Sequence, residues 1–342
     1  LSRTAWNARM PQRPEGRAAI VSAGTADGAV AREVSRTLTY LGWTCERFED
    51  CGVAGLWRIQ SVIDEINKAD VVVVAAGLDA ALASVLGGLT SRPLIAVPTT
   101  AGTGSETTIA AVISGTATHR KRQILDPKIV PFAAILDPEL TVGLPQGNTI
   151  HTAMDALTHA IEGYITKGHC TISDMFHLEA IKLISENLRG AVQNTPEGRE
   201  GMALGQYIAG MGFSNVGLGI VHSMAHGLSA LYDTPHGVAC AILLPVGLEY
   251  NKSVAGERYR AVGKAMGVKG IDEMNDAQAA DATIAAVKQL SADVGIPANL
   301  HGILKEEDIQ FLAESAFADA CRPGNPRDTS VEEIVELYKS QL

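Results

Sequence analysis

The sequence predicts a doubly wound α/β layer followed by an all-α helical domain. Short apolar, β-branched runs alternate with helical periods over roughly the first 100 residues, which is typical of a parallel sheet covered by helices. From about Asn148 onward these runs become rare, and long apolar or amphipathic helical periods replace them. A chain of 342 residues is long enough for two domains, which we expect at 1–147 and 148–342.

The N-terminal layer is predicted to contain four strands. Residues 1–16 are polar and should form a loose arm. The run VVVVAA is apolar throughout, which indicates a strand in the middle of a parallel sheet. Gly42 should stop the first helix. We expect strands at 17–22, 44–48, 71–76 and 93–97, and helices at 29–41, 56–68 and 79–86.

The second half reads as helical throughout. Pro245 is expected to kink or split one of these helices. The border at Leu144-Pro145 marks the expected interdomain cleft, and such clefts commonly bind ligands. We expect helices at 150–164, 173–187, 198–215, 219–232, 238–250, 255–266, 277–294, 305–316 and 331–340.

Composition argues against several kinds of partner. The formal net charge is -10 and no Lys/Arg cluster stands out, so nucleic acid and anionic membranes are poor candidates. No apolar run reaches membrane-spanning length, and no signal peptide precedes the first strand. The five cysteines show no CxxC pair or disulfide framework, so we expect reduced thiols in a cytoplasmic protein.

Two helical segments carry side chains that could bind a metal. His222 and His226 stand at i and i+4 and therefore share one helix face, as do Asp155 and His159. His236 follows a proline, so it should lie at a break in the helix or at the start of the next. The alternative is a set of buried core histidines, but burying these groups without a shared partner would cost several kcal/mol. The pattern favours a divalent first-row metal.

From about residue 93 to the end, the sequence resembles the iron-containing alcohol dehydrogenases, whose fold is like that of dehydroquinate synthase. The resemblance is carried by PLIAVPTTAGTGSE, DPELTVGLP, DALTHAIEGYIT, MGFSNVGLGIVHSMAHGLSALYDTPHGVACAILLP and CRPGNPRDTSVEEIVELY. It implies four metal ligands, namely Asp155, His159, His222 and His236. It places His226 beside the substrate, where it relays a proton or, alternatively, supports the site structurally.

The resemblance also implies a cofactor site for NAD. The loop 98–106 should follow the nicotinamide half, and its hydroxyls should donate hydrogen bonds; the alternative is an ordinary turn. The donors are Thr99, Thr100 and Thr103. Lys121 matches a family lysine near the cofactor ribose, although it could equally be a solvated charge. Asp50 is placed to accept from a ribose 2′-hydroxyl, which favours NAD over NADP.

Residues up to about 98 resemble a different family, the carboxylase/hydrolase of nickel-pincer cofactor synthesis, related to the aminoimidazole ribonucleotide carboxylases. The matching runs are AIVSAGTADGAVAREV, CGVAGLWRI and ADVVVVAAGLDAALASVLGGLTSRPLIAVPT. The dehydrogenases have a G-G-G-S loop after the third strand, whereas this chain keeps only Gly77 and adds the charge of Asp79. Two possibilities therefore stay open. The chain could bind a dinucleotide weakly, or the layer at 17–97 could serve only to support the helical half.

The expected function is that of a metal-dependent, NAD-linked alcohol dehydrogenase. The substrates implied by the resemblance are small alcohols or aldehydes such as propane-1,2-diol and lactaldehyde. Fe²⁺ is the expected metal, with Zn²⁺ as the alternative ion. A metal-binding protein without turnover and a carboxylase-like nucleotide-binding module are the competing hypotheses; the second lacks the segment that carries its family's nucleophile. The assembly state is open, with a homodimer as one option.

Overall fold

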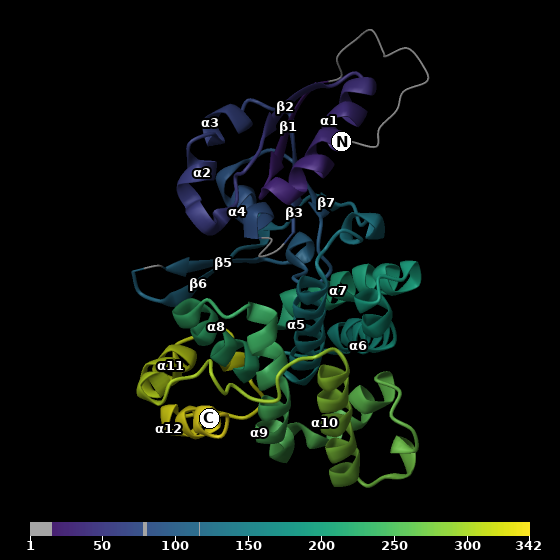
Figure 1. Cartoon of the computed structure of the whole chain (residues 1–342), viewed down its shortest axis with the longest axis vertical. Coiled ribbons are helices and arrows are strands. Elements are labelled where there is room, and N and C mark those ends of the chain that lie inside the picture. Colours follow the sequence, from purple (N-terminus) through teal and green to yellow (C-terminus); the bar gives the residue numbers. More distant parts are fainter. Residues whose placement is uncertain (1–15, 78–80, 116) are drawn as a thin grey trace.

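The computed structural model describes residues 16–77, 81–115 and 117–342. A parallel sheet with its helices occupies one end of the molecule, and a group of helices occupies the other (Figure 1). The predicted fold class is therefore confirmed. Of the arm expected at 1–16, residues 1–15 lie outside the described residues. Among the helices described, none is both long and apolar enough to cross a membrane.

The sheet has five parallel strands in the order β2-β1-β3-β4-β7. Four were predicted, and their observed bounds differ from the predicted ones by no more than one residue. The fifth was not predicted, because a strand of two residues has no period to detect. The strands are β1 (Arg17–Ser22), β2 (Thr44–Phe48), β3 (Val71–Ala76), β4 (Leu94–Pro98) and β7 (Ala133–Ala134).

Alternating side chains give the sheet two buried faces. Ile20, Val73 and Val97 pack on one face with Ala31 of the first helix. Their neighbours along the strands pack on the other face with the next three helices. A parallel sheet covered on both faces is the doubly wound arrangement. The helices are α1 (Gly28–Tyr40), α2 (Leu56–Gln60), α3 (Ile63–Ile66) and α4 (Ala81–Leu89).

The helix predicted at 56–68 is wrong as a single element, because α2 and α3 are separated at Ser61 and Val62. The hydroxyl of Ser61 donates to the carbonyl of Arg58 at 2.7 Å. Val62 then adopts φ -122°, outside the helical range. A serine that bonds to nearby backbone offers the chain an alternative to the helical ladder, and this explains the break.

A β-hairpin that the sequence did not reveal follows the loop after β4. It consists of β5 (Ala110–Gly115) and β6 (Arg120–Leu125), paired in antiparallel register. It lies between the sheet and the helical half, where β5 contacts α4 and β6 contacts α8 (Figure 1). The basic composition of β6 hides its strand character, since only its last residues are apolar.

Eight helices follow the sheet. The first, α5, lies at the centre, since it contacts α6, α7 and α9 and is buried without interruption from Thr152 to Ile165. The helices are α5 (Gln146–Ile165), α6 (Thr171–Val192), α7 (Pro196–Val216), α8 (Ile220–Tyr232), α9 (His236–Ala265), α10 (Asp276–Asp293), α11 (Ile309–Phe317) and α12 (Val331–Lys339).

The segments predicted as helices at 238–250 and 255–266 form one 30-residue helix, α9, with Pro245 inside it. A proline in a helix interior costs about 3 kcal/mol. Buried side chains on either side, including Leu244 and Leu248, pack into the main core. Their burial offsets the lost backbone hydrogen bond, so the helix continues where the local signal predicted a kink or a split.

The loop 98–106 packs tightly on the helical half. A Cβ added to Gly102 would lie 2.3 Å from the Cβ of Thr152 on α5. The N–H of Gly104, a residue at φ +61°, donates to the Gln206 side chain of α7 at 2.9 Å. The loop is therefore a docking element between the halves, and not merely a turn between strands.

Candidate metal centre

Three helices bring the four expected ligand side chains to one point. Asp155 and His159 come from α5, His222 from α8, and His236 from the first turn of α9. The Nε2 atoms of the three histidines lie 3.9, 3.5 and 3.6 Å, respectively, from the same oxygen, Oδ1 of Asp155. One carboxylate oxygen thus faces three imidazole nitrogens.

The unpaired polar atoms at this point fit a metal ion. Oδ1 of Asp155 and Nε2 of His222 are buried and have no hydrogen-bond partner among the described residues. Leaving such atoms unsatisfied costs about 1–3 kcal/mol each. A divalent cation would satisfy them together, since imidazole and carboxylate donors suit first-row metals.

The electrostatics at three of these residues favour the protonation states that metal binding requires. Burial alone would raise the pKa of Asp155, but the neighbouring imidazoles of His159, His236 and His222 outweigh it and hold the pKa below its usual range. Burial lowers the pKa of His159 to about 4 and lowers that of His236 as well. An ionised carboxylate and two neutral imidazoles therefore face one another near neutral pH.

His222 behaves differently, because another carboxylate binds its second ring nitrogen. Nδ1 of His222 lies 2.6 Å from Oε2 of the buried Glu162. Burial lowers the pKa of His222, but Cys240, Asp155 and Glu162 outweigh burial and raise it. A metal at Nε2 would have to displace a proton there, while Glu162 would keep the remaining proton on Nδ1.

Glu162 also fixes the start of α8. Its two carboxylate oxygens accept the backbone N–H groups of Val221 and His222 at 2.8 and 3.1 Å. A Cβ on Gly219 would lie 2.8 Å from Oε1 of Glu162, so only glycine leaves room for this contact. Our sequence reasoning missed the role of Glu162. The available signal was a carboxylate one turn beyond His159 on a largely apolar helix.

A close helix contact positions His236. A Cβ added to Gly237 would lie 1.8 Å from the carbonyl oxygen of His151 on α5, so glycine lets α9 begin against α5. Among the described residues, the compact group of candidate ligand atoms here joins Asp155, His222 and His236 with Cys240. Cys240 was not predicted. Burial raises the pKa of its thiol to about 12, so the thiol stays protonated.

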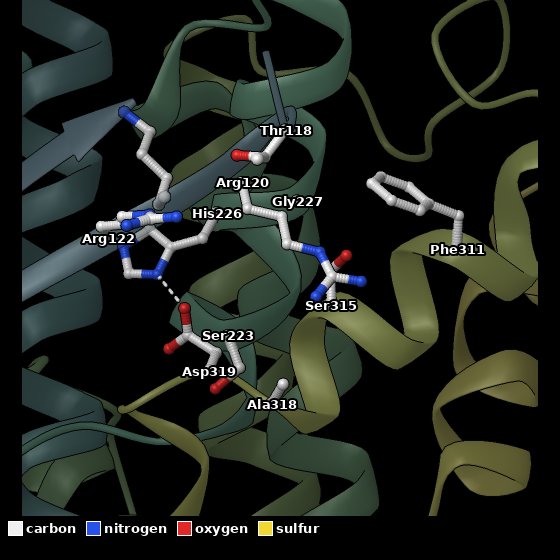
Figure 2. Close-up of a pocket in the computed structure, with 11 residues that line it drawn as sticks. Thr118, Arg120, Arg122, Ser223, His226, Gly227, Phe311, Ser315, Ala318 and Asp319 are labelled. Atoms are coloured by element: carbon white, nitrogen blue, oxygen red, sulfur yellow. Dashed lines mark hydrogen bonds and ion pairs between the residues drawn. The ribbon is translucent and has the colours of Figure 1, made fainter. Parts of the chain in front are cut away.

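His226, the predicted proton relay, lies next to this group. Its ring stacks on the ring of His236 with centroids 5.1 Å apart. Its Nδ1 lies 2.8 Å from Oδ2 of Asp319, the contact drawn in Figure 2. Asp319 also accepts hydrogen bonds from the N–H of Cys321 at 2.8 Å and from Gln123 at 3.2 Å. The carboxylate of Asp319 therefore favours the His226 tautomer that carries its proton on Nδ1.

A cavity of about 530 Å³ opens beside His226. Strand β6, helix α8, helix α11 and the segment that follows α11 surround it (Figure 2). Lys121, which we expected near a cofactor ribose, lines this cavity together with His226 and Asp319. The structure therefore groups Lys121 with the predicted relay.

The other expected cofactor residues lie mostly at the carboxyl ends of neighbouring strands. Gly77 follows β3, and Thr99 and Thr100 follow β4, both of them buried. Thr103 lies farther along the loop. Strand β2 lies on one side of β1, and β3 and β4 lie on the other, so the order of strands changes direction between β1 and β3. Doubly wound folds bind dinucleotides at such a point. Our sequence reasoning missed Asp27 at this point. Its buried carboxylate accepts a hydrogen bond of 2.6 Å from the Thr99 hydroxyl.

Asp50 is only partly available for a ribose. It adopts φ 59°, and its carboxylate lies 2.5 Å from a guanidinium nitrogen of Arg58. Both side chains are solvent-accessible, so this ion pair is weak and a ligand could replace it. Asp79, whose charge we expected to alter the cofactor loop, lies outside the described residues.

Known families match both halves. The model described as "Fe-containing alcohol dehydrogenase family, C-terminal" matches residues 149–342, and "Iron-containing alcohol dehydrogenase" matches residues 15–138. The second match covers most of the segment in which we saw a carboxylase-like sequence. The resemblance to nickel-pincer cofactor synthesis is therefore unsupported, and so is the carboxylase-like hypothesis.

Curated relatives are similar over much of the chain. Lactaldehyde reductase of Escherichia coli K12 is 49% identical over 249 residues, which are 72% of this chain and 65% of that protein. NAD-dependent methanol dehydrogenase of Bacillus methanolicus is 42% identical over 253 residues, 73% of this chain and 66% of that protein. The matched part of the chain thus spans slightly less than two thirds of these relatives.

Solved structures extend the similarity to nearly the whole chain. An alcohol dehydrogenase from Oenococcus oeni has a TM-score of 0.89 at 33% identity, covering 99% of this chain and 100% of that one. Sulfoacetaldehyde reductase from Bifidobacterium kashiwanohense, solved with NAD+, has a TM-score of 0.81 at 26% identity, covering 95% and 90%. The chain belongs to the iron-containing alcohol dehydrogenase family.

Proposed function

We propose that this protein is a metal-dependent, NAD-linked alcohol dehydrogenase and aldehyde reductase for small substrates of the lactaldehyde and propane-1,2-diol kind. The observation that carries the proposal is the convergence of three imidazole Nε2 atoms on Oδ1 of Asp155, with two of the four atoms buried and unpaired. The names of the relatives support the substrate class.

In this proposal the ion is held by four side chains, Asp155, His159, His222 and His236. When bound, a divalent metal supplies Lewis-acid polarisation of an alcohol or carbonyl oxygen. Glu162 keeps the proton of His222 on Nδ1, so that Nε2 points to the ligand position. Fe²⁺ is proposed from the family, with Zn²⁺ as the alternative, because Zn²⁺ binds such sites more tightly than Fe²⁺ does.

His226 is proposed as the proton relay. During oxidation its Nε2 takes up the proton that the alcohol gives up, and during reduction it returns that proton. Asp319 stabilises the charged imidazolium through the 2.8 Å contact to Nδ1. The alternative is a purely structural His226, for which the stacking on His236 is the supporting observation.

NAD is the proposed hydride carrier. A nicotinamide dinucleotide supplies the hydride acceptor or donor. The residues proposed to contact it are Asp50, Gly77, Thr99, Thr100, Thr103 and Lys121. The position of Gly77 and Thr99 at the carboxyl ends of adjacent strands supports this, whereas the buried charge of Asp27 beside them opposes a phosphate. The competing proposal is a metal-binding protein that binds no dinucleotide.

Two measurements test these assignments. Asp155→Ala and His236→Ala should lose stoichiometric metal in elemental analysis, whereas His226→Ala should retain metal and lose turnover. Loss of metal from His226→Ala alone would refute the ligand assignment. Titration of NADH into the metal-loaded protein, followed by fluorescence, then separates the dehydrogenase from the inactive metal-binding protein, which would give no saturable signal.

We also propose a domain border, a cellular location and an assembly state. We place the domain border at residue 147, at the start of the central helix α5 (Gln146–Ile165). A cytoplasmic location is proposed from the five cysteines, all of which are free thiols. Assembly as a homodimer stays one option, which sedimentation of the purified protein would test.

A further inference from the structure

We infer that the cavity beside His226 binds an oxyanion carried by the substrate, so that the preferred aldehydes or alcohols bear a carboxylate, sulfonate or phosphate group. This inference rests on the proposed function and narrows its substrates, because uncharged lactaldehyde and propane-1,2-diol would then be poorer substrates than their anionic counterparts. The cavity volume, about 530 Å³, suits a small organic molecule.

The charge of the cavity lining is the main observation. Arg120, Lys121 and Arg122 are consecutive residues of β6, and all three line the cavity. The lining contains one carboxylate, Asp319, which His226, Gln123 and a backbone N–H already engage. Three cations around one opening attract an anion and orient it.

These cations also have no anionic partner. Within the described parts of the chain, no carboxylate lies within ion-pair distance of Arg120, Lys121 or Arg122. Many other basic side chains are paired, as Arg58 is with Asp50 and Arg189 with Asp293. A chain with a formal net charge of -10 has many carboxylates to offer, yet none neutralises this group. A bound oxyanion would do so.

Neighbouring groups hold and complete the anion site. The guanidinium carbon of Arg120 lies 5.4 Å from the ring centre of Phe311, a cation–π contact that restricts the arginine. Ser315 lines the same cavity, and its buried hydroxyl has no hydrogen-bond partner among the described residues. Arginine suits this task, since its planar fork can donate two parallel hydrogen bonds to one oxyanion. Figure 2 shows Arg120 and Arg122 beside the His226–Asp319 pair.

The location links anion binding to the reaction. His226 lies in the cavity wall, and its ring stacks on that of His236, a proposed metal ligand. None of the four proposed metal ligands lines the cavity, so His226 is the residue that connects an anion held there with the proposed metal centre. The phosphates of the cofactor are a second source of the same oxyanion chemistry, so an experiment must separate substrate from cofactor.

A matched pair of aldehydes provides the test. We would compare kcat/KM for 4-oxobutanoate with kcat/KM for its uncharged methyl ester, using the metal-loaded protein and NADH. The native chain should favour the acid. In Arg120→Gln/Arg122→Gln the ratio of acid to ester should fall by about tenfold for each arginine, the usual range for a charge-assisted hydrogen bond. Arg120→Lys/Arg122→Lys should restore part of the ratio.

Controls show whether the acid-to-ester ratio of kcat/KM reports anion binding in the cavity. Lys288→Gln removes an exposed positive charge from α10, remote from the cavity, and should leave the ratio as it is. Calorimetric titration of 4-oxobutanoate should show binding to the native protein and about tenfold weaker binding for each arginine lost, whether or not turnover occurs. Fluorescence titration of NADH into the same variants shows whether the arginines bind the phosphates of the cofactor and not the carboxylate of the substrate.

The outcomes are distinct. A ratio that is unchanged in Arg120→Gln/Arg122→Gln, or a weakening of NADH binding equal to that of 4-oxobutanoate, overturns the inference while the proposed function stands. If neither these two aldehydes nor lactaldehyde is turned over, the proposed function fails, and the calorimetric titration alone then decides whether the cavity binds the oxyanion.

Discussion

At the level of single residues, Glu162 supports the proposed metal centre without being one of its proposed ligands. Its carboxylate joins α5 to α8, because it accepts two backbone N–H groups at the start of α8 and one ring N–H from His222. The same group therefore satisfies backbone donors that helix ends leave free and sets the orientation of an imidazole. Removing its charge should affect the metal more than the fold.

Glu162→Gln is expected to weaken metal affinity by about 10–100-fold, as is usual when the partner of a ligating histidine is lost. The amide keeps the size of the side chain but cannot accept all three N–H groups equally well. Competition with a chelator, followed by elemental analysis, gives the affinity. Glu179→Gln, an exposed change on α6, is the control. Equal affinities in both variants would contradict the role of Glu162.

Sequence spacing predicted some residues of the site and not others. The i, i+4 pairs Asp155/His159 and His222/His226 revealed two faces, since helical periodicity can be read directly. Asp319 lies 93 residues beyond His226, so only the packing of the segment after α11 brings the two together. Gln123 was hidden because the strand that carries it was not predicted. Contacts between distant segments leave no periodic trace.

At the level of elements, the metal centre depends on how closely α9 approaches α5. The contact between Gly237 and the carbonyl of His151 leaves no room for a side chain. It brings His236 within 3.6 Å of Asp155. A larger residue at position 237 would push the start of α9 outward and carry His236 with it, while the rest of this long helix would stay packed.

We therefore expect Gly237→Ala to lower the free energy of unfolding by about 1–3 kcal/mol, the usual cost of overpacking, and to lose metal. Gly256→Ala, on the same helix, is the matched control. Its nearest neighbour would be 3.8 Å from the new Cβ, so the change should stabilise the helix by about 0.5–1 kcal/mol. Denaturant unfolding and metal analysis of both variants provide the measurement. If Gly237→Ala changed neither the free energy of unfolding nor the metal content, the tight contact would be refuted.

A second element-level feature joins α5, α6 and α7 through His177. Its ring fills the space above two glycines, since a Cβ on Gly163 or Gly212 would lie within 2.3–2.4 Å of its Nε2. Both ring nitrogens are buried and have no hydrogen-bond partner among the residues described. Burial lowers the pKa of His177 to about 4 from an ordinary 6.5, so the folded protein holds this imidazole neutral.

This shift makes the stability depend on pH in a defined direction. Between pH 6.5 and 4 the unfolded chain binds a proton at His177 and the folded chain does not, so stability falls as pH falls through that interval. The loss approaches about 3 kcal/mol near pH 4. His177→Leu should remove that part of the slope when unfolding free energies at pH 7 and 5 are compared. An unchanged slope would show that His177 is protonated or solvated in the folded state.

The elements themselves were predicted unevenly. Strands β1, β3 and β4 are apolar throughout and buried on both faces, which made them easy to recognise. Strand β6 was missed because charged or polar side chains occupy both of its faces: Lys121 and Gln123 are half-buried, and Arg120 and Arg122 are exposed. That pattern contains no apolar face. Helix α9 was divided at Pro245, since the burial that sustains it is a tertiary effect.

At the level of the whole molecule, the question is whether the sheet and the helices unfold together. The sequence alone predicts a short contact surface around 98–106 and Leu144-Pro145, and hence two loosely coupled halves. The structure adds contacts from the hairpin. The N–H of Ile109 donates to the Ser214 hydroxyl of α7 at 3.1 Å, and Gln123 reaches Asp319 at 3.2 Å. These contacts tie the hairpin to both the helical core and the proposed relay.

Metal binding should therefore stabilise the whole chain as one unit. A ligand raises the stability of the unit that binds it by RT ln(1 + [L]/Kd), about 2.7 kcal/mol at a hundredfold excess over Kd. Calorimetry with and without Zn²⁺ should show a single transition that moves upward by a few degrees. Gln123→Ala removes one hairpin contact without touching a proposed ligand, so it should broaden or divide that transition. Two transitions in the native chain, with only one responding to Zn²⁺, would show instead that the sheet unfolds independently of the helices.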